Sequence, residues 1–563
     1  MESGIIRLTL GDWLWNASVA GFLNIIGEKD VRFFDNMVSV SYSCLKNFEE
    51  KYFSYFINTY EQTLPWFKLV SFKKTIEYYQ ETEFKTLNLQ NVRDINLFIK
   101  DTAKKYINQN SFISAFKLMG IAEDIKILEK ELKRITVPKD EITFEESKSS
   151  IIEEIEKQFK VLDKVIEYCS SENGRKYIGA KNVIYSIINN GWNGVSFLNP
   201  QTKEKDIYMD YKKYFVDEAI AYLKEDKKKY KFRCFTCGAP IKNLNNDMSF
   251  INQSGFDVSR KPSHIWDFQN DIAICSVCKL VYSCLPAGFV YVGNSGLYIN
   301  ANLNMEYNKT INSNVKNSVL TEGEKELSSR KIYRALLVAL INQKIIRSKY
   351  ELADVQVVRY ESGTYRFNLL PETTILLIEI HQNELNRLIR TGYKEGNENY
   401  SIYEQVLEQV FNNQNLFLLI NKLLHYKLSS PNSCYFHGGH IIDILKINSR
   451  MIQNLGGMKN MNKERDYLKE AKNAGYHLRE AYIKKDPRTG KIPGISYRLL
   501  NALKTNNRGM FMDVLLNCYL YIGKEVPAVI PEVLRDDDEM FSTIGYAFVS
   551  SFIDGKSEEK IML

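Results

Sequence analysis

The sequence predicts an α+β, mostly helical fold, with a large N-terminal α/β region, an inserted four-cysteine zinc module and a C-terminal four-helix bundle. Three observations lead to this prediction. Apolar residues recur at helical spacing through 92–169 and again in the last part of the chain. Short alternating segments near the N-terminus and at 355–370 are typical of strands. Two Cys-x-x-Cys pairs stand between these regions. We expect domains at 1–231, 232–300, 301–457 and 458–563.

The composition is that of an ordinary soluble protein, with 44% hydrophobic and 25% charged residues. Lys and Arg outnumber Asp and Glu by 75 to 68, an excess that permits a polyanionic partner without requiring one. The N-terminus does not resemble a signal peptide, and charges interrupt every apolar run. We therefore expect a reduced, cytoplasmic protein that does not bind membranes.

The N-terminal region combines strands with helices. Residues 7–10 predict a strand, 13–26 a helix and 31–40 a second strand. The aromatic side chains of 43–67 are expected in the core. In 151–169 one helical face is apolar, and its residues are Ile151, Ile155, Phe159, Leu162 and Ile166.

The two Cys-x-x-Cys pairs predict a structural zinc site. Cys234 and Cys237 form the first pair, and Cys275 and Cys278 the second. Four thiolates on two tight turns match the tetrahedral coordination of Zn²⁺. Gly238 suits the left-handed position that closes such a turn, and Lys279 could offset thiolate charge. Four unremarkable buried thiols, or a dithiol redox pair, are the alternatives.

Two features near the cysteines remain open in the sequence. The gap between the pairs is wider than the roughly 15–20 residues usual for such sites, which indicates an insertion at 239–274. The lysine run 224–231 is either a solvated helix end or a set of phosphate contacts.

The region after the cysteines is expected to be mixed. Alternation and glycines predict strands and turns at 280–299, and an asparagine-rich loop follows at 294–317. A helix at 322–347, a hairpin at 355–370 and helices at 372–390, 402–428 and 441–455 come next.

Cys434, His437 and His440 are either a second metal site or, with two glycines between the histidines, a plain turn. Their spacing fits no common zinc pattern.

Four amphipathic helices are predicted in the C-terminal region, at 461–485, 495–505, 507–523 and 539–552. Residues 463–508 hold twelve basic and five acidic residues, whereas 509–563 hold four and ten. Cations and one aromatic share a face of the first helix, which suggests either a track for a nucleic-acid strand or a solvated surface. The candidate nucleic-acid-binding residues are Arg465, Lys469, Lys472, Tyr476, Arg479, Lys484, Lys485, Arg488 and Lys491.

The sequence carries no common catalytic motif: HExxH, GxSxG and the deaminase pair HxE with PCxxC are all missing. A faint Walker-like ending at 555–557 lacks the first glycine. We therefore expect a non-catalytic protein.

Several motifs together resemble a known family. They are Trp13-Leu-Trp-Asn-Ala, Phe232-Arg-Cys-Phe-Thr-Cys-Gly, Lys261-Pro-Ser-His-Ile-Trp-Asp-Phe, Cys275-Ser-Val-Cys, Leu285-Pro-Ala-Gly-Phe and the helical bundle. In this order they resemble the large subunit of the type I-B CRISPR Cascade surveillance complex, the CXXC–CXXC family. Only the double Cys-x-x-Cys block is specific.

The resemblance implies an RNA-guided DNA-binding machine in which this subunit senses the flanking motif (PAM) and opens the duplex. It also implies stabilisation of the R-loop. The implied partners are guide CRISPR RNA, target double-stranded DNA and its displaced single strand, the Cascade backbone and other subunits, and a separate helicase-nuclease. The alternative is a zinc-ribbon nucleic-acid-processing enzyme with a dispersed active site.

The resemblance also raises the possibility of a second product from the same gene. Internal initiation at Met458 or Met461 would yield a separate helical small subunit, and adjacent glycine codons upstream can spell a ribosome-binding sequence.

Overall fold

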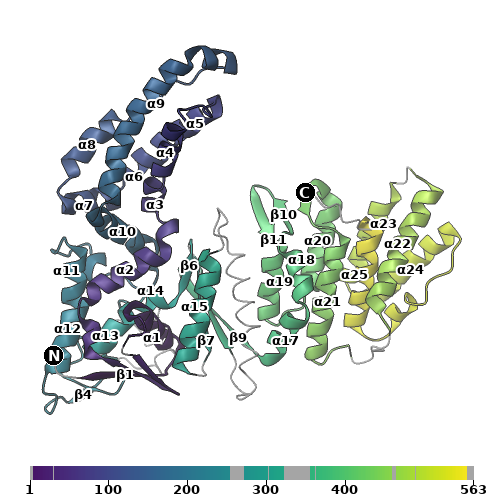
Figure 1. The fold of residues 1–563 in the computed structure, drawn as a ribbon. Helices are drawn as coiled ribbons and strands as arrows, with labels where there is room; N and C mark the ends of the chain where they lie inside the picture. The colour runs from purple at the N-terminus through teal and green to yellow at the C-terminus, as the bar shows by residue number, and fades with distance from the viewer. Residues whose placement is uncertain are drawn as a thin grey trace. The chain divides into compact units, whose positions relative to one another are not determined.

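The fold is described from a computed structural model of the 563-residue chain. The structure describes residues 4–29, 31–253, 272–293, 295–301, 304–321, 355–361, 363–458, 465–487 and 490–554. Two compact units divide it: Met1–Leu327 with Val358–Phe367, and Ser328–Val357 with Asn368–Leu563. Figure 1 shows helices dominating both units, which confirms the α+β, mostly helical fold class.

The first unit begins with a three-stranded antiparallel sheet of order β1-β3-β2 and the helix α1. Their bounds are β1 Ile5–Thr9, α1 Trp13–Ile26, β2 Val31–Phe34 and β3 Met37–Ser41. The predicted helix at 13–26 is confirmed, and the Asp12 side chain caps it by accepting from the Trp15 N–H. The prediction of a single strand at 31–40 is wrong. These residues form a hairpin, in which β2 and β3 pair antiparallel with Phe34 opposite Met37.

The aromatic-rich segment supplies the core, as predicted. Helix α2 (Phe48–Tyr60) buries Tyr52, Phe53 and Phe56 completely. Further helices complete this unit, with α3 to α10 in its upper part and α11 and α12 below them in Figure 1. They are α3 Pro65–Val70, α4 Lys73–Glu81, α5 Leu89–Leu97, α6 Lys105–Ile107, α7 Asn110–Met119, α8 Ala122–Glu131, α9 Glu141–Ser170, α10 Glu172–Ser186, α11 Ile207–Tyr211 and α12 Glu218–Lys224. The apolar face predicted in 151–169 is buried in α9.

Two predictions after the cysteines are wrong in part. Residues expected as strands form helices α13 (Ser276–Ser283) and α14 (Leu285–Gly288) before the strands β6 (Val290–Val292) and β7 (Ser295–Ala301). The expected loop contains helix α15 (Met305–Thr321). Two of its asparagines, Asn308 and Asn312, are buried and hydrogen-bonded within the fold. The Asn312 side chain donates to and accepts from the Ile299 backbone.

Close backbone contact joins α14 to α1. A Cβ on Gly21 would stand 2.0 Å from the Cys284 carbonyl oxygen, and one on Gly288 would stand 2.0 Å from that of Ala17. Only glycine permits this approach. The segment that follows the second cysteine pair is therefore fixed against the first helix of the chain.

The second unit is mostly helical. The predicted hairpin at 355–370 is confirmed as β8 (Val355–Glu361) and β9 (Thr364–Leu370). Its residues Val358–Phe367 belong to the first unit, whose four-stranded sheet has the order β6-β7-β8-β9. The structure has two helices in place of each single helix predicted at 372–390 and 402–428. The elements are α17 Glu372–Ile380, α18 Gln382–Leu388, β10 Gly392–Glu395, β11 Glu398–Ser401, α19 Ile402–Phe411, α20 Phe417–Ser429, β12 Cys434–Tyr435 and α21 Gly438–Asn454. The helix predicted at 322–347 lies outside the described residues.

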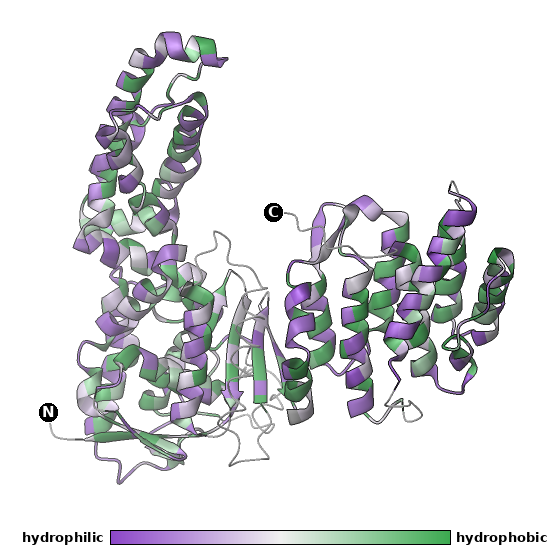
Figure 2. Cartoon of the chain, turned by 45° about the vertical axis from the view of Figure 1, so that its right-hand side comes forward, coloured by the Kyte–Doolittle hydropathy of each residue, from purple (hydrophilic) through white to green (hydrophobic). Residues whose placement is uncertain are grey.

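The four C-terminal helices are confirmed as α22 Tyr467–Lys485, α23 Lys491–Lys504, α24 Arg508–Ile522 and α25 Asp538–Asp554. Helix α25 is buried along almost its whole length, packing on α22, α23 and α21. Figure 2 shows hydrophilic and hydrophobic residues on different sides of the helices in this unit. Among the described residues, no helix combines the length and the apolar character needed to cross a membrane.

Candidate metal centre

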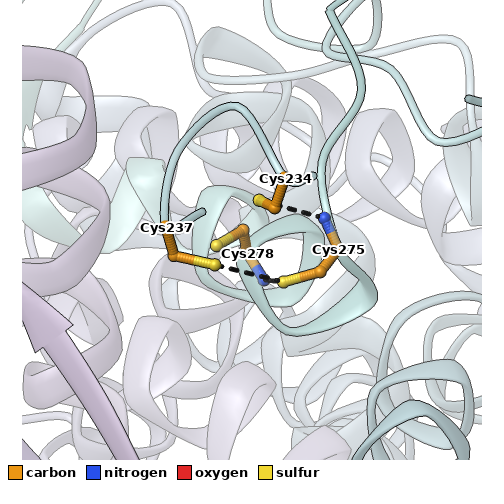
Figure 3. Close-up of side chains that lie close together, drawn as sticks. All are labelled: Cys234, Cys237, Cys275 and Cys278. Carbon is orange, nitrogen blue, oxygen red and sulfur yellow. Dashed lines mark hydrogen bonds between the residues drawn. The ribbon is translucent and has the colours of Figure 1, made fainter. Parts of the chain in front are cut away.

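The four predicted cysteines converge in the first unit. Their sulfur atoms all lie within 4.8 Å of one another, and the Sγ atoms of Cys237 and Cys275 are 3.8 Å apart. Figure 3 shows the side chains pointing toward a common centre. A tetrahedron with Zn–S bonds of about 2.3 Å has sulfur–sulfur edges of about 3.8 Å, so the arrangement has the dimensions of a zinc site.

The first pair lies on a short hairpin. Strands β4 (Phe232–Arg233) and β5 (Pro240–Ile241) pair antiparallel, and the turn between them carries Cys234 and Cys237. The Gly238 N–H donates to the Cys234 carbonyl (2.9 Å) while Gly238 adopts φ of +69°. The left-handed residue expected after this pair is therefore confirmed.

The second pair lies at the start of helix α13. Cys275 is its N-cap residue, and its Sγ accepts from the Cys278 N–H at 3.4 Å. The Cys275 N–H in turn donates to the Sγ of Cys234 at 3.2 Å. These N–H groups and the positive end of the helix dipole stabilise negative charge on the sulfurs. The fold thus favours thiolates at this point.

The four thiols share hydrogen bonds that shift their pKa values in opposite directions. Hydrogen bonds from the other three cysteines hold the pKa of Cys234 far below its usual value. Hydrogen bonds with the neighbouring cysteines, above all the one with Cys234, raise the pKa of Cys275 and of Cys278. Four sulfurs this close cannot all ionise without a counter-charge. A divalent cation supplies that charge, and the four residues fit one Zn²⁺ with no open position.

Lys279, which could offset thiolate charge, also has partners outside the cysteine cluster. Its side chain is buried, but the ammonium lies 2.9 Å from a Glu218 carboxylate oxygen and 3.8 Å from the centre of the Tyr214 ring. The Lys279 ammonium is therefore held by a carboxylate and an aromatic ring. Backbone N–H groups of Cys275 and Cys278 contact the sulfurs directly.

Helix α13 is anchored in the core of the unit by its last residues. The Ser283 carbonyl accepts from Tyr52 Oη and from Trp192 Nε1, both at 2.9 Å. The Ser283 hydroxyl lies 2.8 Å from Tyr211 Oη. The metal site is therefore connected to the hydrophobic core through α13. Loss of a bound ion is expected to destabilise the core as well as the cysteine turns.

The cluster of Cys434, His437 and His440 has a helix-capping role. His437 Nδ1 accepts from the Gly439 N–H, and His440 Nδ1 accepts from the His437 N–H, each at 3.1 Å. Together these bonds form the capping box of α21. The Cys434 thiol donates to the Ser430 carbonyl. Across the described residues, Cys234, Cys237, Cys275 and Cys278 are the single group that could hold a metal ion.

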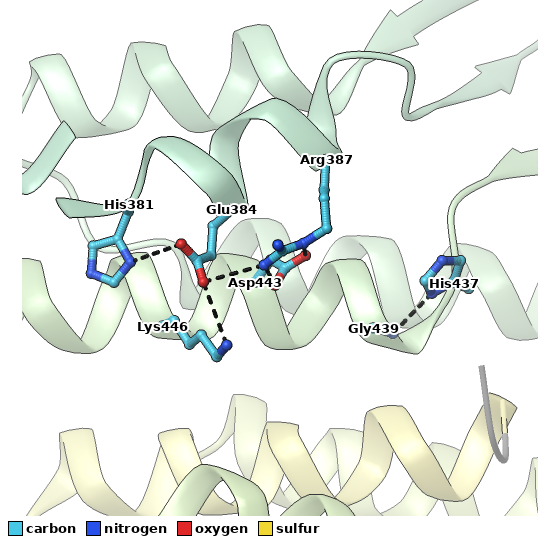
Figure 4. Close-up of polar contacts among 7 residues, drawn as sticks. All are labelled: His381, Glu384, Arg387, His437, Gly439, Asp443 and Lys446. Carbon is cyan, nitrogen blue, oxygen red and sulfur yellow. Dashed lines mark hydrogen bonds and ion pairs between the residues drawn. The ribbon is translucent and has the colours of Figure 1, made fainter. Parts of the chain in front are cut away.

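A charged network that sequence reasoning missed lies beside this cap and joins α18 to α21 (Figure 4). The Arg387 guanidinium donates to both carboxylate oxygens of Asp443, at 2.7 and 2.8 Å. Glu384 accepts from Arg387 and pairs with Lys446 and His381 at 3.2–3.5 Å. Asp443 is buried, so these bonds stabilise the packing of the two helices.

Two arginines of the predicted nucleic-acid stripe are held inside the second unit. The Arg465 guanidinium is bonded to Glu470 and, at 3.0 Å, to Glu532. Arg479 donates to the carbonyls of Phe552 and Ile553, at 3.0 and 2.6 Å, and so caps the C-terminal end of α25. Their guanidinium groups stabilise the bundle.

The other predicted residues differ in their contacts and in their exposure to solvent. Lys485 donates to the Tyr521 carbonyl, and the Lys485 and Lys491 ammonium groups lie 4.2 and 4.5 Å from the Tyr521 ring centre. Lys469 and Lys484 are exposed, whereas Lys472 and Tyr476 are half-buried. Arg488 lies outside the described residues. A binding surface on α22 therefore remains a prediction, now centred on Lys469 and Lys472.

Comparison with known proteins yields one informative result. No curated protein and no solved structure matches the chain. The family model described as CRISPR-associated protein (Cas_CXXC_CXXC) matches residues 225–290, a segment that begins in the lysine run and includes both cysteine pairs. The segment of this chain that carries the four cysteines is thus similar to that CRISPR-associated family.

Proposed function

We propose that the chain is the non-catalytic large subunit of a type I-B CRISPR Cascade complex. The observation that carries the proposal is the match of residues 225–290 to a CRISPR-associated family, over a segment that brings four cysteines together at zinc-site dimensions. In this role the subunit helps to recognise the motif that flanks the target, opens double-stranded DNA and stabilises the R-loop. Base pairing of the guide RNA reads the target sequence.

The metal has a structural part in this proposal. Four protein sulfurs complete the coordination of one Zn²⁺, whereas a catalytic zinc needs an open position for water or substrate. When bound, the ion cross-links the β4–β5 hairpin to α13. The residues of the chain then present nucleic-acid-binding surfaces to the complex, and strand cleavage falls to a separate helicase-nuclease that the subunit helps to recruit.

The test is to express the tagged chain with its neighbouring reading frames, purify it and sequence the RNA that accompanies it. We expect short guide RNAs with a common repeat-derived 5′ end, and binding to duplexes that carry both the guide match and a flanking motif. A preparation that contains no guide RNA would contradict the proposal. DNA or RNA cleavage by the purified chain alone would instead favour a zinc-ribbon enzyme.

A further inference from the structure

The hairpin that carries Cys234 and Cys237 lies in the most basic stretch of the first unit. From 227 to 246 there are six basic residues and no Asp or Glu. The whole chain is nearly balanced, with 75 Lys and Arg against 68 Asp and Glu, so the imbalance here is local. The basic residues are Lys227, Lys228, Lys229, Lys231, Arg233 and Lys242.

The register of the hairpin sorts its side chains onto two faces. Phe232 pairs with Ile241, and Arg233 pairs with Pro240. Extending this register by one residue places Lys231 opposite Lys242. Directly opposed residues share a face, and neighbours along a strand alternate. One face therefore carries Lys231, Arg233 and Lys242, all exposed, while the other carries Ile241, which is buried.

Among the residues that the structure describes, no carboxylate pairs with the lysines on this face. Lys227 lies 4.5 Å from the Tyr222 ring centre, and Arg233 donates to the Gly238 carbonyl at 3.1 Å. Lys231 and Lys242 form no ion pair with any residue that the structure describes. Opposed like charges destabilise a strand pair. An anion between them would remove that repulsion, so this face is suited to a negatively charged partner.

We infer that this face of the zinc hairpin, formed by Lys231, Arg233 and Lys242, binds the phosphate backbone of double-stranded DNA. The inference rests on the proposed function and adds a specific contact surface to it. Charge complementarity identifies a polyanion, since a duplex displays one phosphate per about 1.7 Å of its axis. Backbone contacts of this kind fix the position of a protein on DNA and do not read its sequence.

The position of the aromatic ring favours a duplex over a single strand. Single-strand surfaces combine cations with aromatic rings on which unpaired bases stack. Phe232 is 43% exposed but belongs to the Ile241 face, away from Lys231 and Lys242. Phe235, in the turn between the strands, is also exposed. Within the paired strands, the cationic face carries no aromatic ring. The zinc cysteines hold its turn rigid, which reduces the entropy lost on binding.

The test compares the double variant Lys231→Glu, Lys242→Glu with a charge-matched control, Lys157→Glu, Lys160→Glu, on the exposed side of α9. Fluorescence anisotropy of the full-length chain is measured with a duplex DNA, the same single-stranded DNA and the same single-stranded RNA, at several salt concentrations. We expect the hairpin variant to lose about tenfold in duplex affinity and the salt slope to fall by about 2, while the control changes less than twofold.

Three results would overturn the inference: an unchanged duplex affinity and slope, an equal loss in the control, or a loss confined to single-stranded DNA or RNA. Zinc content close to that of the unmodified chain shows that the variant is folded. The neutral pair Lys231→Gln, Lys242→Gln should lose the same salt slope, because two phosphate contacts are still removed. Absence of guide RNA from the purified complex would contradict the proposed function alone, so the two failures are distinguishable.

Discussion

The carboxylate of Asp554 accepts a hydrogen bond of 2.6 Å from the backbone N–H of Gly438. The last residue of α25 thereby caps the first turn of α21, where an unsatisfied N–H and the positive end of the helix dipole both favour a carboxylate. Lys427, on α20, lies 3.6 Å from the same side chain. The C-terminal helices are thus bonded to the helices that precede them in the second unit.

Replacing this carboxylate should destabilise the second unit. We expect Asp554→Ala to lower its free energy of unfolding by about 0.5–2 kcal/mol, the usual cost of losing a helix cap. Thermal unfolding of the full-length chain measures the effect. Asp538→Ala, at the other end of α25, is a control that leaves this cap intact. Equal stability of the Asp554 variant and the unmodified chain would show that the bond contributes nothing.

The zinc site should be essential for the first unit. Cys234→Ser is expected to reduce the zinc content from about one ion per chain to near zero, and to lower the unfolding temperature, because metal binding is coupled to folding. Metal analysis by mass spectrometry measures the first effect. Cys434→Ser, outside the cluster, is the control. Zinc-free protein with four freely alkylated thiols would contradict the site.

Arg479 should act on stability, and Lys469 and Lys472 on DNA binding. We expect Arg479→Ala to lower the free energy of unfolding by about 1–3 kcal/mol, because it leaves the Phe552 and Ile553 carbonyls without their charged donor. Thermal unfolding of the full-length chain measures this loss.

The variant Lys469→Glu, Lys472→Glu should keep its unfolding temperature but bind target DNA more weakly, with a smaller salt slope. The charge-matched control is Lys504→Glu, Lys524→Glu. Unchanged DNA affinity would show that the exposed side of α22 is a solvated surface that does not bind DNA.

The capping box of α21 should make the second unit sensitive to acid. Burial, with the nearby His437, lowers the pKa of His440 from 6.5 to about 4. An unfolded chain binds the proton near pH 6.5, so between pH 6.5 and 4 it binds more protons than the folded chain. The stabilisation is complete above pH 6.5 and is lost as the pH falls toward 4. The charges of Asp443, Arg387 and Lys427 also act on the pKa of His440, Asp443 raising it and the two cations lowering it.

Thermal unfolding at a series of pH values tests this. His440→Gln retains an acceptor for the His437 N–H, since glutamine is a usual residue at this position of a capping box. We expect the variant to unfold at a temperature that changes less between pH 7 and 4.5 than that of the unmodified chain. If both chains lose stability in parallel, His440 is not the responsible group.

Local patterns allowed much of the fold to be predicted. Helix α1 and the hairpin β8–β9 follow from apolar periodicity and turn residues that lie within each segment. Helix α15 was expected as a loop because its asparagines favour loops, but Asn312 is held by the backbone of Ile299, 13 residues away. A single sequence does not show that such a partner is available.

The metal site could be predicted from local spacing, whereas the fate of the nucleic-acid stripe depends on residues distant in sequence. The four cysteines were predictable because two short spacings determine the ligand geometry. The roles of Arg465 and Arg479 depend on Glu532 and Phe552, which are 67 and 73 residues distant. Helical periodicity placed both arginines beside Lys469 and Lys472 but did not show that their guanidinium groups bond within the bundle.

The last prediction is that the gene gives a second, shorter protein by internal initiation at Met461. Met461 lies outside the described residues, and α22 begins shortly after it at Tyr467. A product that starts there contains α22–α25. Within it α22 and α23 pack on α25, and Phe511 of α24 contacts the Phe541 ring of α25. It lacks α20 and α21, and so loses the bonds from Asn421 to Tyr546 and from Gly438 to Asp554.

The consequence is that the short product should not persist as an isolated monomer. The side of α25 that packs on α21 would be exposed, and large apolar surfaces of this kind drive association. We expect the unmodified gene with a C-terminal tag to yield a short tagged product that elutes as an oligomer or with the full-length chain. Met461→Leu, with the upstream glycine codons recoded silently, should abolish it. Absence of the product from the unmodified gene, or its persistence after recoding, would contradict internal initiation, and a monomeric product would contradict the role assigned to α20 and α21.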